Sequence, residues 1–263
     1  MLVTSCQSPL MDDACRAIAG YVAARLGLPV RFIDELPWPE RYRQLDAGVI
    51  DVAWICGAPY ERRVDAVADI ELLAAPIWAG ERYGDQPVYF SDVVVRRDSR
   101  FATFADLRGA VCAYNEPGSF SGYEAMRHHL AAQGLDGSFF AAWVESGAHS
   151  RSLELVCSGA ADVAAIDSTV LEAASARRPQ LQDALRVLAV LGPNPMPPWV
   201  VSRRVAPATR ARLRELFTAM HADNAGRAIL QAGGIARFVA VTDVDYGPTR
   251  WALEVAAGVK PCH

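Results

Sequence analysis

The amino-acid sequence predicts an α/β fold made of two lobes, and three observations lead to this prediction. Segments with the apolar patterns of strands and of amphipathic helices alternate along almost the whole chain, as is typical of sheets covered by helices. The alternation starts again near residue 90, and a proline-rich stretch at residues 192–198 precedes a return. We therefore predict two mostly parallel sheets, with the second lobe inserted into the first. A single large doubly wound sheet is the alternative.

The first ninety residues begin with a strand and a helix that has clear end signals. Residues 2–5 read as the strand, and Ser8 with Pro9 fits an N-cap followed by proline at the first helical position. Gly27 fits the glycine that ends the helix. Its apolar stripe repeats every fourth residue, at Ala14, Ile18, Val22 and Leu26. Three more strand-like segments and one helix follow, at residues 30–33, 51–56 and 72–78, and at residues 40–47.

The second lobe repeats this organisation. Its strands are predicted at residues 110–114, 140–144, 162–166 and 185–190, and its helices at residues 104–108, 119–133 and 149–158. Extended segments at residues 88–95 and 199–202 are predicted to join the lobes as a two-strand hinge. Three helices end the chain, at residues 207–221, 224–231 and 248–257. The predicted lobes are residues 1–90 with 197–263, and residues 91–196.

Composition and charge exclude several classes of function. The 263 residues are 52% hydrophobic and carry a formal net charge of -4 without a basic stripe, so we expect no nucleic-acid partner. No apolar run approaches the roughly 18 residues of a membrane span, so we expect no direct membrane insertion. The six cysteines form no CxxC pair and read as buried free thiols. Residues 1–5 show no signal peptide; the expected compartment is cytoplasmic if the chain is complete as numbered, and periplasmic if a leader was omitted.

The segment at residues 111–122 (VCAYNEPGSFSG) carries the most chemistry. A strand runs into a loop with two glycines and two serines, and then into a helix whose first N–H groups lack intrahelical partners. Such a helix start attracts anions, and Ser119 and Ser121 add hydroxyl donors there. An ordinary serine N-cap is the alternative. The segment lacks the lysine of a P-loop and the central serine of a nucleophile elbow.

Four stretches, in order along the chain, resemble the phosphonate/phosphite-binding members of the type II periplasmic binding proteins. They are residues 51–60 (DVAWICGAPY), residues 119–122 (SFSG), residues 146–150 with 158–167 (SGAHS and SGAADVAAID), and residues 238–250 (FVAVTDVDYGPTR). The resemblance implies two lobes that close on a small anionic ligand in a cleft. The implied ligand-binding residues are Tyr60, Ser119, Phe120, Ser121, Gly122, His149 and Asp167.

Each implied residue also has a purely structural interpretation. Tyr60 could cap a loop, His149 could begin a helix, and Asp167 could cap the helix that follows it. Phe120 departs from the family loop, which commonly has a small hydroxyl residue between the two serines. This departure removes one donor, so the sequence leaves the identity of the anion open.

The expected function is binding of a small oxyanion-bearing solute of the phosphonate, phosphite or phosphate-ester class. The protein would serve an ABC transporter, with its permease as partner, or act as a sensor. We expect no enzyme activity, no cofactor and no metal; the neighbouring His128 and His129 face different directions on their helix. The alternative is an enzyme on the same fold that acts on a small metabolite. In one form of this alternative, Ser119 or Ser121, His149 and Asp167 make a hydrolytic triad.

Overall fold

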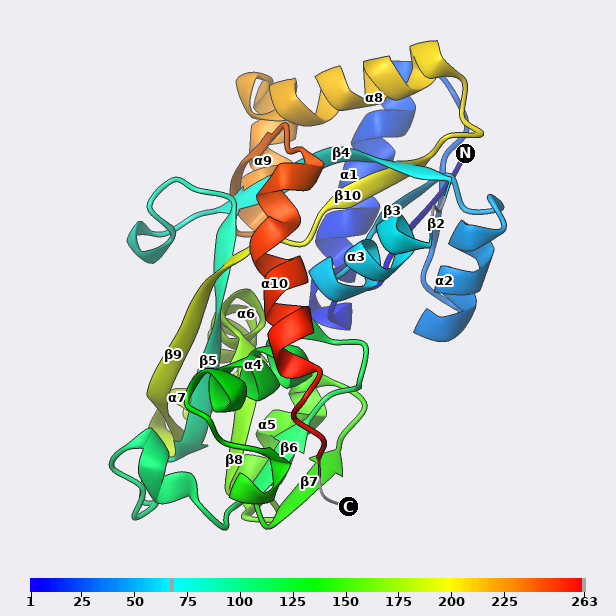
Figure 1. Ribbon diagram of the computed structural model, residues 1–263. Helices are drawn as coiled ribbons and strands as arrows, with labels where there is room; N and C mark the ends of the chain where they lie inside the picture. The colour runs from blue at the N-terminus through cyan, green and yellow to red at the C-terminus, as the bar shows by residue number, and fades with distance from the viewer. Residues whose placement is uncertain (67–68, 262–263) are drawn as a thin grey trace. The chain divides into compact units, whose positions relative to one another are not determined.

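The computed structural model describes residues 1–66 and 69–261, which form two compact units. The first unit comprises Met1–Val88 and Pro195–Gly247, and the second comprises Tyr89–Asn194 and Pro248–His263. Each unit has its own sheet with helices packed on it (Figure 1). The predicted two-lobed α/β fold is therefore confirmed.

The first unit is built on a six-stranded sheet with the order β11-β4-β10-β3-β1-β2. In chain order these strands are β1 (Leu2–Ser5), β2 (Arg31–Ile33), β3 (Val52–Trp54), β4 (Ile70–Trp78), β10 (Trp199–Ser202) and β11 (Ile235–Val239). Strand β1 pairs in parallel with β2 and β3, whereas β10 lies antiparallel between β3 and β4. The sheet is mixed rather than mostly parallel, because the returning strand enters its centre.

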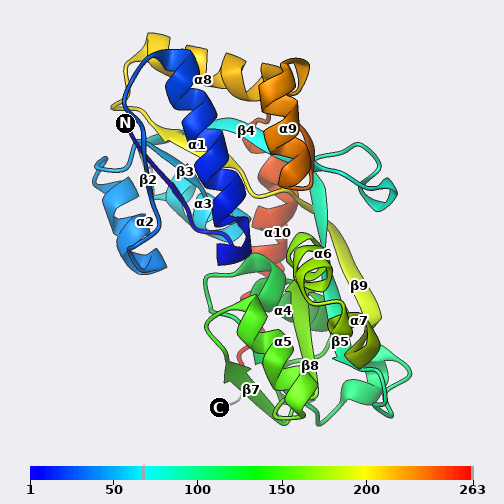
Figure 2. The same cartoon turned by 180° about the vertical axis from the view of Figure 1, so that it is seen from behind.

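The helices of the first unit cover both faces of this sheet. They are α1 (Asp12–Leu26), α2 (Trp38–Asp46), α3 (Gly57–Asp65), α8 (Pro207–Ala219) and α9 (Asn224–Ala232). Helix α1 contacts both α8 and α9, and the three helices lie on one face of the sheet (Figure 2). The predicted ends of α1 are confirmed. Ser8 caps the short turn that precedes α1, and Gly27 ends α1 in the left-handed conformation, at φ 65°.

The second unit has a five-stranded sheet with the order β7-β6-β8-β5-β9. Its strands are β5 (Val88–Arg96), β6 (Val111–Tyr114), β7 (Ala142–Glu145), β8 (Val163–Asp167) and β9 (Leu185–Pro195). Strand β6 runs parallel to β7 and β8, and β5 runs antiparallel to β8. The carboxyl ends of β6 and β8 therefore meet at one edge of the sheet, where ligands commonly bind in α/β folds.

Five α-helices belong wholly or mainly to the second unit: α4 (Ala125–Ala132), α5 (His149–Ser158), α6 (Ser168–Arg177), α7 (Gln180–Ala184) and α10 (Gly247–Ala256). Short 3-10 turns complete the chain at Pro9–Met11, Glu81–Tyr83, Phe104–Leu107, Gly137–Phe139, Met220–Ala222 and Asp243–Tyr246. Helix α5 packs on β6 and β8, and in Figure 2 it faces the viewer. No helix within the described ranges is long and apolar enough to span a bilayer.

The chain passes between the units at three places, after Val88, after Asn194 and after Gly247. Strand β5 begins at the first passage and β9 ends at the second, so the return runs along β9 and not along residues 199–202. The third passage leads into α10, so the predicted place of residues 248–257 in the first lobe is wrong. Contacts within the second unit hold this end of the chain: Arg127 Nε donates to the Val259 carbonyl at 2.7 Å.

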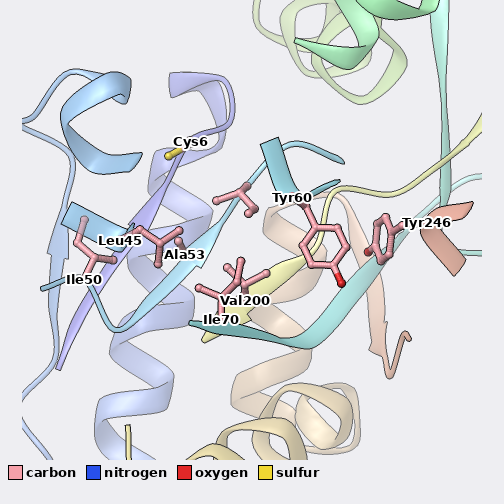
Figure 3. Packing of buried hydrophobic residues seen from close by; sticks show 9 residues of the cluster. Cys6, Leu45, Ile50, Ala53, Tyr60, Ile70, Val200 and Tyr246 are labelled. Carbon is pink, nitrogen blue, oxygen red and sulfur yellow. The ribbon is translucent and has the colours of Figure 1, made fainter. Parts of the chain in front are cut away.

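A buried cluster of the first unit brings distant segments together (Figure 3). Tyr60 from α3 and Tyr246 lie side by side, with ring centroids 4.9 Å apart. The Tyr246 hydroxyl donates to the Met196 carbonyl at 3.0 Å. This bond joins Tyr246, just before the passage after Gly247, to Met196, just after the passage that follows Asn194. The five cysteines within the described residues are free thiols.

Candidate anion-binding site

The loop after β6 and the helix start that follows it form the core of the candidate site. Ser119 is the N-cap, and its Oγ accepts a hydrogen bond from the Gly122 N–H at 3.2 Å. A short π-helix, Phe120–Glu124, follows and continues as α4. Single π-turns of this kind are frequent at functional sites. The Ser119 hydroxyl proton has no acceptor among the described residues, so this donor is available to a ligand.

Ser121 and His149 meet across this helix start. Ser121 Oγ lies 2.9 Å from His149 Nε2, and both side chains are buried. His149 is the first residue of α5, whose amino end lies beside β6. Burial lowers the pKa of His149 from 6.5 to about 4, so the ring is neutral at physiological pH.

The tautomer of His149 determines whether Ser121 donates its hydroxyl proton to the ring or keeps it for a ligand. His149 Nδ1 is buried and has no partner among the described residues. A buried N–H without an acceptor is rarer than an unused acceptor, which favours the tautomer with its proton on Nε2. His149 then donates to Ser121 Oγ, and the Ser121 hydroxyl proton is left for a ligand oxygen.

Gly122 allows two side chains to approach the helix start closely. A Cβ at this position would lie 2.0 Å from Asn115 Oδ1 and 3.0 Å from His149 Cε1. Asn115 directly follows β6 and is only 5% exposed. Sequence reasoning missed Asn115, because nothing in the local pattern shows that its side chain lies against Gly122 and His149. An amide directly after a strand, in a loop with two serines, was the one available signal.

Phe120 occupies the first position of the π-helix and is 3% exposed. Its side chain is apolar and carries no hydroxyl group. A backbone N–H is the only donor that this residue offers. Position 120 therefore adds no side-chain donor to the helix start.

Asp167 ends β8 and caps α6. Its Oδ1 accepts from the Thr169 N–H at 2.9 Å and from the Thr169 hydroxyl at 2.7 Å. The structural interpretation of Asp167 as a helix cap therefore holds in the structure. Burial raises the pKa of Asp167 from 3.8 to about 6 in spite of these two bonds.

Tyr60 lies in the first unit, near the start of α3, and is 4% exposed. Its hydroxyl donates to Asp243 Oδ1 at 3.1 Å. In this arrangement the phenolic proton is already used, and the carboxylate beside it disfavours an anion. Of the seven predicted residues, five come together around the helix start at Ser119; Asp167 lies at the carboxyl end of the neighbouring strand β8, and Tyr60 belongs to the other unit.

The hydrolytic triad is not formed. Ser121 and His149 are paired, but Asp167 Oδ1 is bonded to Thr169 and His149 Nδ1 has no partner within the described ranges. A triad needs the acid to orient the histidine through that nitrogen. Among the described residues there is also no group of three or more His, Cys, Asp or Glu side chains that could hold a metal ion.

Comparison with known proteins gives one family match over nearly the whole chain. The family model described as "ABC transporter, phosphonate, periplasmic substrate-binding protein" matches residues 1–246.

Solved structures give the same fold at low sequence identity. A binding-protein component of an ABC phosphonate transporter from Pseudomonas aeruginosa is 18% identical, with a TM-score of 0.85 over 98% of this chain and 86% of that chain. PhnD1 from Prochlorococcus marinus, solved with methylphosphonate, is 15% identical, with a TM-score of 0.86 over 98% of both chains. XAC2383 from Xanthomonas citri, solved with ATP, is 18% identical, with a TM-score of 0.75 over 98% of this chain and 96% of that chain.

Proposed function

Since this chain belongs to the family of periplasmic substrate-binding proteins of phosphonate ABC transporters, we propose that the helix start at Ser119 holds the oxyanion of its ligand. The family members are solute-binding proteins and not enzymes. The proposal therefore concerns which residues bind the solute.

The pairing of Ser121 with a neutral, buried His149 carries the proposal. A hydroxyl that accepts from His149 Nε2 presents its own proton in a fixed direction, and Ser119 adds a second hydroxyl proton from the N-cap. The free N–H groups and the dipole of the helix start add to the attraction for an anion. His149 contributes by positioning Ser121, because its low pKa keeps it uncharged.

Two further residues complete the proposed site with different roles. Tyr60 would offer its hydroxyl to the ligand after that hydroxyl leaves Asp243. Asp167 repels an anion and would accept from an amine or hydroxyl at the far end of the ligand. Phe120 would line the site with apolar surface, and Gly122 would keep the helix start accessible.

The decisive experiment is isothermal titration of the protein with methylphosphonate, phosphite, phosphate esters and methanesulfonate. Removing one hydrogen bond to a charged group costs roughly 1.5–3 kcal/mol, so Ser121→Ala should weaken binding of the preferred ligand roughly ten- to a hundred-fold. Ser202→Ala is the matched control, because Ser202 is a buried serine of the first unit whose Oγ accepts from the Arg204 N–H. Equal binding by wild type and Ser121→Ala, or no binding of any panel member by wild type, would reduce the helix start to a plain N-cap.

The family description supports a proposal about the place of action. We propose that the protein works in the periplasm and delivers its solute to an ABC transporter permease. Fractionation of the native organism, with detection of this chain in the periplasmic extract, tests the compartment. Recovery only from the cytoplasm would favour a sensor on the same fold.

A further inference from the structure

The side-chain amide of Asn115 lies at the helix start with its hydrogen-bonding capacity unused. Asn115 Oδ1 is buried and has no hydrogen-bond partner in the described chain. Its NH2 group donates no hydrogen bond to the described residues, and the amide nitrogen, unlike Oδ1, is not one of the fully buried polar atoms without a partner. A buried amide oxygen without a partner opposes folding, so its presence calls for a reason other than stability.

The position of this amide is fixed by its neighbours. Its oxygen lies so close to Gly122 that any Cβ there would meet it at 2.0 Å, and the same point is 3.0 Å from His149 Cε1. The Asn115 backbone is held by its carbonyl, which accepts from the Gly147 N–H at 2.7 Å. With the carbonyl oxygen enclosed between Gly122 and His149, the NH2 group is the part of the amide left to act as a donor.

We infer that Asn115 is a ligand-binding residue, whose NH2 group donates to the oxyanion and replaces the hydroxyl that Phe120 lacks. This inference rests on the proposed function of the Ser119 helix start. It deepens that function by defining the ligand class as an oxyanion with at least three acceptor oxygens, one each for Ser119, Ser121 and Asn115. Phosphonates and phosphate monoesters meet this requirement, and carboxylates do not.

The role of Asn115 predicts a separation between affinity and stability. Asn115→Leu keeps much of the side-chain shape and removes both polar atoms. If the amide serves only the ligand, the ligand-free variant should melt at or above the temperature of wild type, because an unpartnered buried polar group is lost. Its affinity for methylphosphonate should fall roughly ten- to a hundred-fold. Asn115→Asp, which puts a negative oxygen in place of the NH2 group, should lose more affinity than Asn115→Leu.

The test combines calorimetric titration with methylphosphonate and acetate, and thermal unfolding without ligand, for both variants. Asn224→Leu is the control, since Asn224 begins α9 in the first unit; it should bind as wild type does. Wild-type affinity in Asn115→Leu would overturn the inference. A large loss of thermal stability in Asn115→Leu, together with normal ligand binding by Asn115→Asp, would also overturn it, because the amide would then serve the fold and not the ligand. Tight binding of acetate by wild type would overturn the ligand class. Failure of wild type to bind any oxyanion would instead remove the proposed function itself.

Discussion

Gly122→Ala is the substitution whose effect the structure defines most sharply. The new Cβ would lie 2.0 Å from Asn115 Oδ1, 2.8 Å from Asn115 Cγ and 3.0 Å from His149 Cε1. Since side-chain carbons essentially never come within 3.0 Å of a neighbouring heavy atom, the amide oxygen must retreat by at least 3.0 − 2.0 = 1.0 Å. Its backbone is held by the bond from Gly147, so the movement falls on the side chain and on His149.

Both consequences of this movement can be measured. Overpacking of a filled site costs about 1–3 kcal/mol, which should lower the free energy of unfolding in urea by that amount. Displacement of His149 also releases Ser121, so affinity for methylphosphonate should fall at least ten-fold beyond any effect of stability.

Gly20→Ala provides the control for Gly122→Ala. Gly20 lies inside α1, and a Cβ there meets no atom within 4 Å. Alanine in that position should stabilise the protein by about 0.4–1 kcal/mol and leave binding unchanged. If Gly122→Ala binds methylphosphonate as tightly as Gly20→Ala does, the close packing at the helix start has no part in ligand binding.

Three further predictions concern single contacts and pH. Tyr246→Phe removes the bond to the Met196 carbonyl and should cost about 1 kcal/mol of unfolding free energy; unchanged urea denaturation would contradict this. The folded pKa of Asp167, about 6, lies above its unfolded value of 3.8, so its contribution to stability is present below pH 3.8 and is lost as pH rises through 6. Ionisation of Asp167 should lower the free energy of unfolding by about 3 kcal/mol at pH 7. Asp167→Asn should remove this loss, because asparagine does not ionise and can still cap α6. A variant no more stable than wild type at pH 7 would refute the raised pKa. The pKa of His149 is lowered to about 4, so its contribution is present above pH 6.5 and is lost as pH falls through 4; His149→Gln should therefore show less loss of stability than wild type between pH 6.5 and pH 4, and an equal loss would contradict the assignment.

Local patterns predicted much of the fold, because local chemistry decides where helices and strands begin and end. The Ser8 cap and the Gly27 end of α1 follow from backbone groups that need partners within one turn. Helix α3 is absent from the predicted elements, although its start has a local explanation. Glycine and proline at residues 57–59 (GAP) are typical of a chain break, but proline in the first turn of a helix replaces an N–H that needs no helical partner.

The order of the strands could not be predicted in the same way. Strand β10 inserts between β3 and β4, and its partners lie more than 120 residues away in the sequence. Alternating apolar residues show that a segment is a strand but do not identify its neighbour. The position of α10 is a similar case, because an amphipathic helix at the end of the chain can pack on either unit.

The candidate site shows the same division between local and distant information. Ser119 and Ser121 could be predicted from the loop and the helix that follows it, because an N-cap and its free N–H groups are local. The family resemblance implied Tyr60 as a donor, yet its hydroxyl already donates to Asp243, a carboxylate 183 residues further along the chain. The residue type determines which hydrogen-bond donors and acceptors a side chain has, but tertiary packing determines their partners. For that reason Asn115, whose one local signal is its place directly after a strand, becomes a candidate only when Gly122 and His149 are seen beside it.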